Sequence, residues 1–289
     1  MASTRELRRK IQSVKSTGKL TRAMQMVAAS KMAKATSAAQ ASKTYAEAAW
    51  TVIGDLVARS GRSHPLFTAR PTGKRALIVL ASNRGLAGAY NTQVFRLAMT
   101  ELGDDARPPE TQVEVITVGR KALQYFRRFH ADQLVADFAA SDSTPHITEA
   151  AAIASLITKQ FLAGQYRQVD VVRNAFVSTL VQKPVVDRLL PIEPQAVEAS
   201  AELGEFVIEP SPAEVLSALA TRIVPLRLYQ MLLESSAAEH SARMVAMKSA
   251  TDNAKEIAAD LTLTYQSVRQ ANITREIIEV ASGAAALAS

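Results

Sequence analysis

Residues 233–268 read LESSAAEHSARMVAMKSATDNAKEIAADLTLTYQSV, and their spacing decides the fold. Within this stretch and on both sides of it, residues of one helical face recur at alternating intervals of three and four. The stripe comprises Leu216, Leu219, Ile223, Leu226, Gln230, Leu233, Ala237, His240, Met244, Met247, Thr251, Ala254, Ala258, Leu261, Tyr265, Val268, Asn272 and Arg275. An average spacing of 3.5 residues is typical of a helix that winds around a partner in a left-handed supercoil. The sequence therefore predicts a long C-terminal coiled-coil helix.

The predicted helix has a clear start. Ser211-Pro212 followed by Glu214 is a typical N-cap and first turn. Pro225 should kink the helix or divide it near its start, because proline removes a backbone donor and its ring collides with the preceding turn. Between Ala237 and Ala258 the stripe is mostly small or polar, which favours close approach of the partner over strong apolar adhesion.

The first sixty residues supply a partner of the same kind. From Thr4 to about Ser60 there is no proline, and the only glycines are Gly18 and Gly54. A second, less regular stripe runs through Leu7, Ile11, Val14, Gly18, Thr21, Met24, Ala28, Lys31, Ala35, Ala38, Ser42, Tyr45, Ala49, Val52 and Leu56. A helix of about 55 residues would be about 80 Å long. The two terminal helices most simply pack as an antiparallel pair; the alternative is that each belongs to a separate bundle.

The middle of the chain, residues 73–210, alternates strand and helix patterns. Strands are expected at 75–82, 112–119, 134–138, 169–181 and 185–192, and helices at 90–102, 120–130 and 147–164. Such alternation predicts an α/β domain with a parallel, doubly wound sheet. The acidic, proline-containing segment 193–212 is expected to link this domain to the last helix.

The positive charge of the chain is concentrated at one end. The formal net charge is +7, with 34 Lys and Arg against 27 Asp and Glu. Residues 1–45 hold ten of these bases and one acid, so the segment carries +9 and the remainder −2. Three interpretations stay open: a nucleic-acid surface, a solvated helix face, or a site for an acidic protein partner. Aromatic side chains that could stack on bases are absent before Tyr45.

The sequence contains no convergent set of catalytic residues. There is no cysteine, which excludes a thiol nucleophile, a disulfide and cysteine-ligated metals. His240 is expected to be a packed polar position, and the four histidines, at 64, 130, 146 and 240, lack metal-ligand spacing. The turn Gly85-Leu86-Ala87-Gly88 lies between a strand and a helix, where Arg84 could face an anion. It has neither a third glycine nor Gly-Lys-Ser/Thr, so a tight turn is favoured over a nucleotide pocket.

Three segments resemble the gamma subunit of F-type ATP synthases. Residues 5–35 (RELRRKIQSVKSTGKLTRAMQMVAASKMAKA) are similar to the N-terminal helix of that family, and residues 240–287 are similar to its C-terminal helix. The turn 82–91 (SNRGLAGAYN) resembles the first strand-to-turn motif of its middle domain. It departs from the family pattern at Asn83, where Asp is usual, and at Ala87, where bacterial members often have Cys.

The resemblance implies a central rotor shaft. Its fold is a long antiparallel coiled coil of the terminal helices, residues 1–60 and 211–289, with a central Rossmann-like α/β domain at 73–210. In the family, the coil lies inside a ring of alpha and beta subunits, and the middle domain contacts the epsilon subunit and the membrane-embedded c-ring. Proton flow turns the shaft, which drives the beta subunits through ATP synthesis; hydrolysis reverses this. The chain itself is expected to be non-catalytic, to hold no cofactor or metal, and to bind no nucleic acid.

The resemblance also implies where the shaft meets the ring. Met24, flanked by Arg22 and Gln25, is expected to meet an acidic lever segment of the beta subunits. The residues expected to meet their catch loop are Arg269, Gln270, Thr274 and Glu276. A further set near the N-terminus, Arg8, Arg9 and Lys10, follows from the +9 segment, because a basic helix complements acidic levers electrostatically.

The expected location follows from the same resemblance. Met1 runs directly into the first helix without a transit peptide, which is typical of a bacterial member. The middle domain has no room for the insertion of plant and cyanobacterial relatives, and the absence of cysteine excludes thiol regulation. No apolar run reaches the ~18–20 residues of a membrane span. We expect a peripheral protein on the cytoplasmic face of the plasma membrane, associated with it only through the complex.

Overall fold

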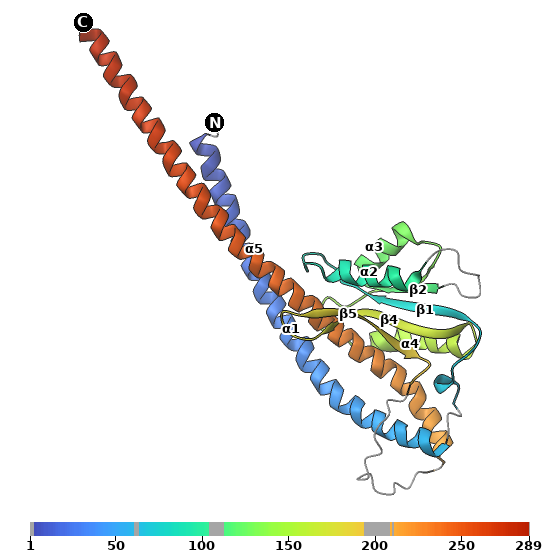
Figure 1. The fold of residues 1–289 in the computed structure, drawn as a ribbon. Coiled ribbons are helices and arrows are strands. Elements are labelled where there is room, and N and C mark those ends of the chain that lie inside the picture. The colour runs from blue at the N-terminus through green and yellow to red at the C-terminus, as the bar shows by residue number, and fades with distance from the viewer. Residues whose placement is uncertain (1–2, 61–63, 104–112, 194–208, 210, 289) are drawn as a thin grey trace. The chain divides into compact units, whose positions relative to one another are not determined.

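The computed structural model describes residues 3–60, 64–103, 113–193, 209 and 211–288. It begins with helix α1 (Thr4–Ser60) and ends with helix α5 (Pro212–Ala288), so the two long terminal helices are confirmed (Figure 1). The elements between them are η1 (Pro65–Phe67), β1 (Lys74–Leu80), α2 (Tyr90–Leu102), β2 (Val113–Val118), α3 (Arg120–Phe129), β3 (Leu134–Phe138), α4 (Ile147–Leu162), β4 (Tyr166–Phe176) and β5 (Gln182–Leu190). The chain forms two compact units: residues 1–27 with 244–289, and residues 28–243.

The larger unit contains a five-stranded sheet in the order β3-β2-β1-β4-β5. The pairs β3–β2, β2–β1 and β1–β4 are parallel, which confirms the predicted sheet for these four strands. β5 departs from the prediction, because it lies antiparallel to β4. Only residues 177–181 connect these two strands, and a parallel crossover needs a dozen or more residues.

Both faces of the sheet are covered, as the continuous apolar run of β1 requires. Ala76, Ile78 and Leu80 point into a cluster that includes the buried face of α4. Leu77 and Val79 point the other way, into a cluster with α2 and α3. Figure 1 shows this layering, with α2 and α3 on one side of the sheet and α4 on the other.

The adjoining parts of α1 and α5 complete the core on the α4 side. Ile53 and Leu56 of α1 and Leu216 and Leu228 of α5 belong to the same cluster as α4. α5 is one helix across Pro225, so the predicted division does not occur. Buried side chains immediately before and after the proline pack into this core, and their packing holds the helical path.

The predicted stripe on α1 fails near its C-terminal end. Tyr45 is 69% exposed and Val52 44% exposed, whereas their neighbours Ala46 and Ile53 are buried; Leu56 is buried, as the stripe predicts. A straight helix repeats every 3.6 residues and drifts against a 3.5-residue pattern, so the buried face moves by one residue. The predicted linker 193–212 lies mostly outside the described residues.

The smaller unit is an antiparallel helix pair. A Cβ placed on Gly18 would lie 3.3 Å from Cβ of Ala254, and Thr21 faces Thr251. Because the α1 number rises while the α5 number falls, the helices run in opposite directions. The buried residues of this pair all belong to the two predicted stripes: Leu7, Thr21, Met247, Thr251, Ala254 and Ala258. The antiparallel alternative is therefore the observed one.

Candidate functional site

The centre of the helix pair combines close packing with one polar contact. Oγ1 of Thr21 and Oγ1 of Thr251 are 2.7 Å apart in a buried position. Each oxygen also lies within hydrogen-bond distance of its own helix, at the carbonyls of Gly18 (3.1 Å) and Met247 (2.8 Å). Two hydroxyl protons serve three contacts, so one threonine donates across the pair while the other donates within its own helix. This contact fixes the register of α1 against α5.

The three basic residues near the N-terminus lie on more than one face of α1. Arg8, Arg9 and Lys10 are all exposed. Consecutive residues of a helix project about 100° apart, because there are 3.6 residues in each turn. The positive charge therefore extends around the helix, and it does not form a patch on a single face.

The residues of the second predicted contact set, Arg22, Met24 and Gln25, differ in their exposure to solvent. Arg22 is exposed, whereas Met24 and Gln25 are half-buried. Arg22 and Gln25 are three positions apart and share one side of α1. A partner would thus reach the Arg22 guanidinium freely, but it would touch only part of Met24.

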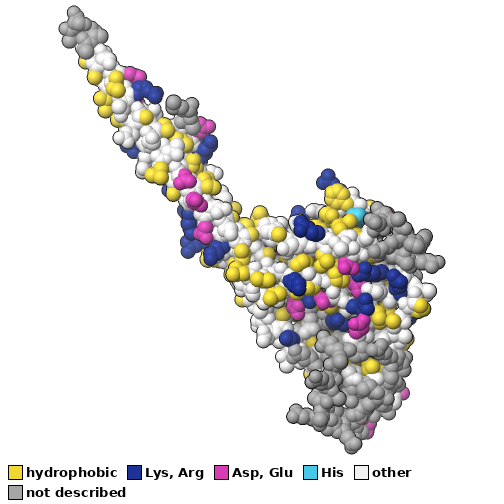
Figure 2. Space-filling model, in the orientation of Figure 1, with side chains coloured by type: hydrophobic (Ala, Val, Ile, Leu, Met, Phe, Trp, Pro, Cys, Tyr) yellow, Lys and Arg dark blue, Asp and Glu magenta, His cyan; other side chains and the backbone are white. Residues whose placement is uncertain are grey.

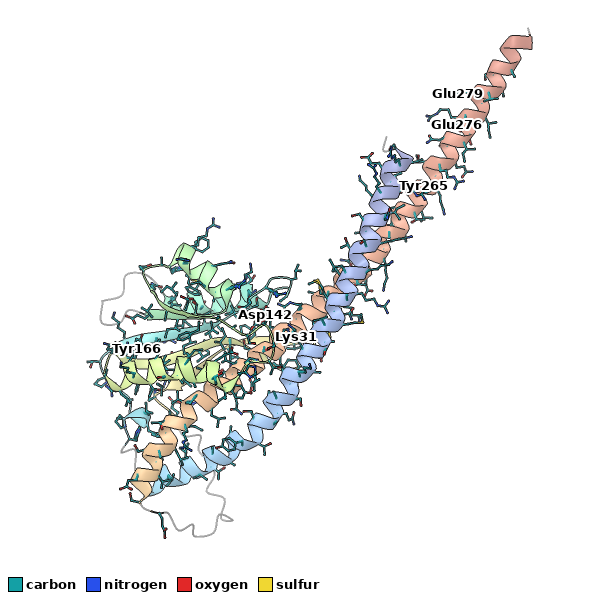
Figure 3. The ribbon with its side chains drawn as sticks, turned by 180° about the vertical axis from the view of Figure 1, so that it is seen from behind. Lys31, Asp142, Tyr166, Tyr265, Glu276 and Glu279 are labelled. Carbon is teal, nitrogen blue, oxygen red and sulfur yellow. The ribbon has the colours of Figure 1, made fainter. Side chains whose placement is uncertain are left out.

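The third set lies where α5 continues beyond its pairing with α1. In the observed register, residue 268 is opposite Thr4, the first residue of α1. Arg269, Gln270, Thr274 and Glu276 are all exposed, and Thr274 Oγ1 donates to the carbonyl of Gln270 at 3.0 Å. Figure 3 shows Glu276 and Glu279 on this part of α5, with Tyr265 near the start of α1.

The structure does not bring the second and third sets together. Met24 is opposite residue 248 in this register, and Arg269 is 21 positions further along α5. At 1.5 Å per residue the two sets are about 32 Å apart along the helix. They are therefore separate surfaces.

The exposed end of α5 is also apolar. Ile273 is 43%, Ile277 62%, Ile278 58% and Val280 73% exposed. Figure 2 shows hydrophobic side chains along this end of the helix, interspersed with a few charged ones. A surface of this kind differs from the basic one on α1.

In the larger unit, a polar cluster that the sequence pattern does not predict lies at the carboxyl end of β1 and comprises Lys31, Asn83, Arg84 and Asp142. Arg84 Nη2 lies 2.8 Å from Asp142 Oδ2, and Asn83 Nδ2 donates to Asp142 Oδ1 at 3.0 Å. Lys31 of α1 donates to the backbone carbonyl of Asp142, and Figure 3 shows these two residues close together. The hydrogen bond from Asn83, with Arg84, lowers the pKa of the Asp142 carboxyl. The anion that Arg84 faces is thus a side chain of this protein.

α5 covers the glycine turn after β1. Arg243 Nη2 donates to the carbonyl of Arg84 at 3.3 Å and to the carboxylate of Glu239 at 2.7 Å. Leu86 and Gly88 take left-handed backbone angles, with φ of 63° and 55°. In a sheet of this order, ligands bind where the order of the strands reverses, between the parallel neighbours β1 and β4. Here, side chains of α5 pack onto the turn at that position.

His240 is the packed polar residue that the sequence predicts. Its side chain is 6% exposed, and Nδ1 lies 3.1 Å from Nη1 of Arg243. Burial, together with the positive charges of Arg243 and Lys31, lowers its pKa to about 4. Burial raises the pKa of the neighbouring Glu239, against the effect of Arg243. His240 is therefore neutral at pH 7.

Arg173 forms two ion pairs, one within the sheet to β5 and one that ties α5 to the sheet. Arg173 of β4, which is 8% exposed, has Nε 2.6 Å from Asp187 Oδ2 and Nη1 2.7 Å from Glu234 Oε2.

Within the described residues, no three His, Cys, Asp or Glu side chains could together hold a metal ion. No helix in the same part of the chain is long and apolar enough to cross a membrane.

Comparison with known proteins finds close relatives over the whole chain. A family model described as ATP synthase matches residues 3–287. An ATP synthase gamma chain of Roseiflexus castenholzii is 46% identical over 291 residues, covering 100% of this chain and 99% of the relative. One of Pelotomaculum thermopropionicum is 43% identical, covering 99% of this chain and all of the relative. A chain of the Euglena gracilis mitochondrial ATP synthase (OSCP/F1/c-ring) has a TM-score of 0.68 at 17% identity, covering 98% of this chain and 94% of that one.

Proposed function

We propose a function that proceeds from family membership: the chain belongs to the ATP synthase family, among the gamma chains, and acts as the central rotor shaft. In this role it transmits torque between the proton-driven c-ring and the catalytic beta subunits, in synthesis and in hydrolysis. The observation that carries the proposal is the antiparallel pair of terminal helices in fixed register, joined at Thr21 and Thr251. We assign the chain no catalytic step of its own.

Torque must pass from the α/β domain into the two helices, and the larger unit has contacts for this step. Glu234 of α5 pairs with Arg173 of β4, and Ser241 Oγ donates to the carbonyl of Thr179 at 2.6 Å. Lys31 links α1 to the Asp142 cluster. Contacts on both helices support rotation of the helices together with the sheet.

The ring contacts are the three sets of residues on the helix pair. We propose that Arg22, Met24 and Gln25 meet the acidic levers of the beta subunits, and that Arg8, Arg9 and Lys10 complement the same charge. The exposed end of α5, with Arg269, Gln270, Thr274 and Glu276, meets a second loop of the beta subunits. The Arg22–Gln25 set and the exposed end of α5 are separated along the helix pair, which supports contacts with the beta subunits at two positions along its axis.

The partners follow from this assignment. We propose that the coiled-coil segments 1–60 and 211–289 contact the alpha and beta subunits. The central segment 73–210 contacts the epsilon subunit and the c-ring. The chain then lies on the cytoplasmic face of the plasma membrane, as a peripheral protein held by the complex.

The decisive experiment is reconstitution. The full chain is mixed with alpha and beta subunits of the same organism, and the product is tested by size-exclusion chromatography and ATPase assay. A single copy of the chain in each complex, with ATP-driven rotation of a bead attached to the α/β domain, is the expected result. Failure to join the ring, together with tight and strongly salt-dependent binding of duplex DNA, would favour the nucleic-acid interpretation instead.

A further inference from the structure

The helix pair of the smaller unit has a groove, and of the residues that line it only Arg22 belongs to the proposed ring contacts. The groove has a volume of about 670 Å³. It extends from Val14 to Arg22 on α1 and from Thr251 to Gln266 on α5. At 1.5 Å per residue, this is about 22 Å of α5. The volume lies in the range of about 300–1,000 Å³ that is usual for small-molecule sites.

The floor of the groove is narrow and apolar. It is formed by Gly18, Ala254, Ala258 and Ala259, none of which has a side-chain atom beyond Cβ. At one end, Leu263 also lines the groove, and it is 66% exposed. Because the helices touch at Gly18 and Ala254, the groove is a slot along their junction.

The rim of the groove is basic. Lys15, Lys19, Arg22 and Lys255 line it, and none of the lining residues is acidic. Lys15, Lys19 and Arg22 form no ion pair with any other residue that the structure describes. Lys255 bonds Asp252 at 2.9 Å, but that pair is exposed to solvent, and Asp252 does not line the groove. The slot therefore combines hydrocarbon walls with an uncompensated positive charge.

We propose that this groove binds a single-chain amphipathic anion, of the class of long-chain alkyl carboxylates. The headgroup lies among Lys19, Arg22 and Lys255, and the alkyl chain follows the small-residue floor toward Leu263. This polarity follows from the register, because the bases cluster at the end near Thr251 and Leu263 lies at the opposite end.

Other occupants fit the groove less well. A helix is about 10–12 Å wide with its side chains and cannot enter a slot between two helices in contact. Inorganic phosphate would interact with the rim but leave the apolar floor in water. A neutral hydrocarbon would cover the floor but leave the positive charge of Lys15, Lys19 and Arg22 without a partner. Only an amphipathic anion satisfies both features.

Binding is tested by isothermal titration calorimetry of the full chain with laurate below its critical micelle concentration. The expected result is saturable binding at one site. Dodecyltrimethylammonium, with the same chain length and the opposite charge, and inorganic phosphate should each bind at least tenfold more weakly. Equal binding of either one would overturn the proposal.

Two variants locate the site. Ala259→Leu fills the slot from an exposed position, and Lys19→Glu with Arg22→Glu reverses the charge of the rim. Each should weaken laurate binding at least tenfold while far-ultraviolet circular dichroism stays unchanged. The matched control is Lys248→Glu, an exposed lysine of the same unit outside the groove, which should bind laurate like the parent.

A final experiment distinguishes binding of a free amphiphile from binding to a membrane surface. The chain is sedimented with phosphatidylglycerol vesicles, and the retained fraction is compared with that on phosphatidylcholine vesicles. We expect laurate binding that the groove variants weaken at least tenfold, whatever fraction of the chain the vesicles retain. Retention on phosphatidylglycerol without laurate binding would overturn it, and so would laurate binding that both groove variants leave intact.

Discussion

Tyr90 and Ser235 share a buried hydrogen bond of 2.7 Å, although 145 positions separate them in the sequence. The bond joins the first turn of α2 to α5. The Tyr90 hydroxyl also lies 3.2 Å from the backbone carbonyl of Ser235, and burial raises its pKa. The α/β domain and α5 are thus connected by a polar contact that is closed to water.

Tyr90→Phe should lower the free energy of unfolding by about 1–3 kcal/mol, because it leaves Ser235 buried without this partner. Ser235→Ala should lower the free energy of unfolding by less, since the backbone carbonyl of residue 235 can still accept a hydrogen bond from Tyr90. Urea unfolding followed by circular dichroism measures both. Tyr45→Phe is the matched control, because Tyr45 is 69% exposed. Equal losses for Tyr90→Phe and Tyr45→Phe would show that the contact contributes nothing.

Gly18→Leu should destabilise the helix pair by about 1–3 kcal/mol through overpacking. Even a Cβ at this position lies 3.3 Å from Ala254. The measurement is thermal unfolding followed at 222 nm. Gly283→Leu is the control, because nothing lies within 4 Å of a Cβ there. A midpoint for Gly18→Leu as high as that of the control would contradict the close approach of the helices.

Stability should fall as the pH is lowered from 6.5 to 4, because His240 has a folded pKa of about 4 against its ordinary 6.5. In this window the unfolded chain binds a proton that the folded chain excludes. The loss from this group is at most about 3 kcal/mol at pH 4. His240→Gln should flatten the profile of urea midpoints between these pH values. His130→Gln, which removes a histidine of the α/β domain, should retain the parent's slope. If His240→Gln also kept that slope, the pH dependence of stability would come from groups other than His240.

Arg269→Ala with Gln270→Ala should reduce ATP synthesis in the assembled complex severalfold. Both residues are exposed, so the free energy of unfolding should stay within about 0.5 kcal/mol of the parent. The matched control is Glu256→Ala with Asp260→Ala, two exposed residues of α5 outside the proposed contacts. Assembly with a normal rate of ATP synthesis would refute the role of Arg269 and Gln270.

Replacing Arg8, Arg9 and Lys10 by Gln should slow association with the alpha–beta ring about tenfold at low ionic strength. The difference should shrink at high salt, because the charges are exposed and are screened. Stopped-flow light scattering at two salt concentrations measures it. Replacement of Arg120, Arg127 and Arg128 on α3 removes the same charge elsewhere. If that variant slows association equally, the association rate depends on the net charge of the chain and does not depend on the position of the charges on α1.

Much of the fold could be predicted from the sequence because its patterns are strongly periodic. The stripe from Met244 to Val268 matches the observed burial, since here α5 has one partner and one buried face. The bounds of α2 and β3 were also predicted correctly, because turn residues enclose each segment. The direction of β5 was predicted wrongly, because the strand–helix alternation was extended to it although only residues 182–184 separate the last two expected strands.

Contacts between distant segments were harder to predict from the sequence. Asp142, Arg84 and Lys31 belong to three separate segments, and each on its own is typical of a solvated charge. Their meeting depends on the sheet order, which places the loop after β3 near the end of β1. The groove between α1 and α5 likewise requires the register of the pair, which periodicity alone leaves undetermined.

The last twenty residues or so of α5 have a mechanical consequence. Up to residue 268 this helix is braced by α1, and beyond it the described chain is a single helix of about 30 Å. One helix twists and bends under a smaller load than two wound together. Elastic compliance in the smaller unit is therefore greatest at this tip. Under torque the tip should deform first and store energy as a spring, while the braced portion turns as a rigid axle.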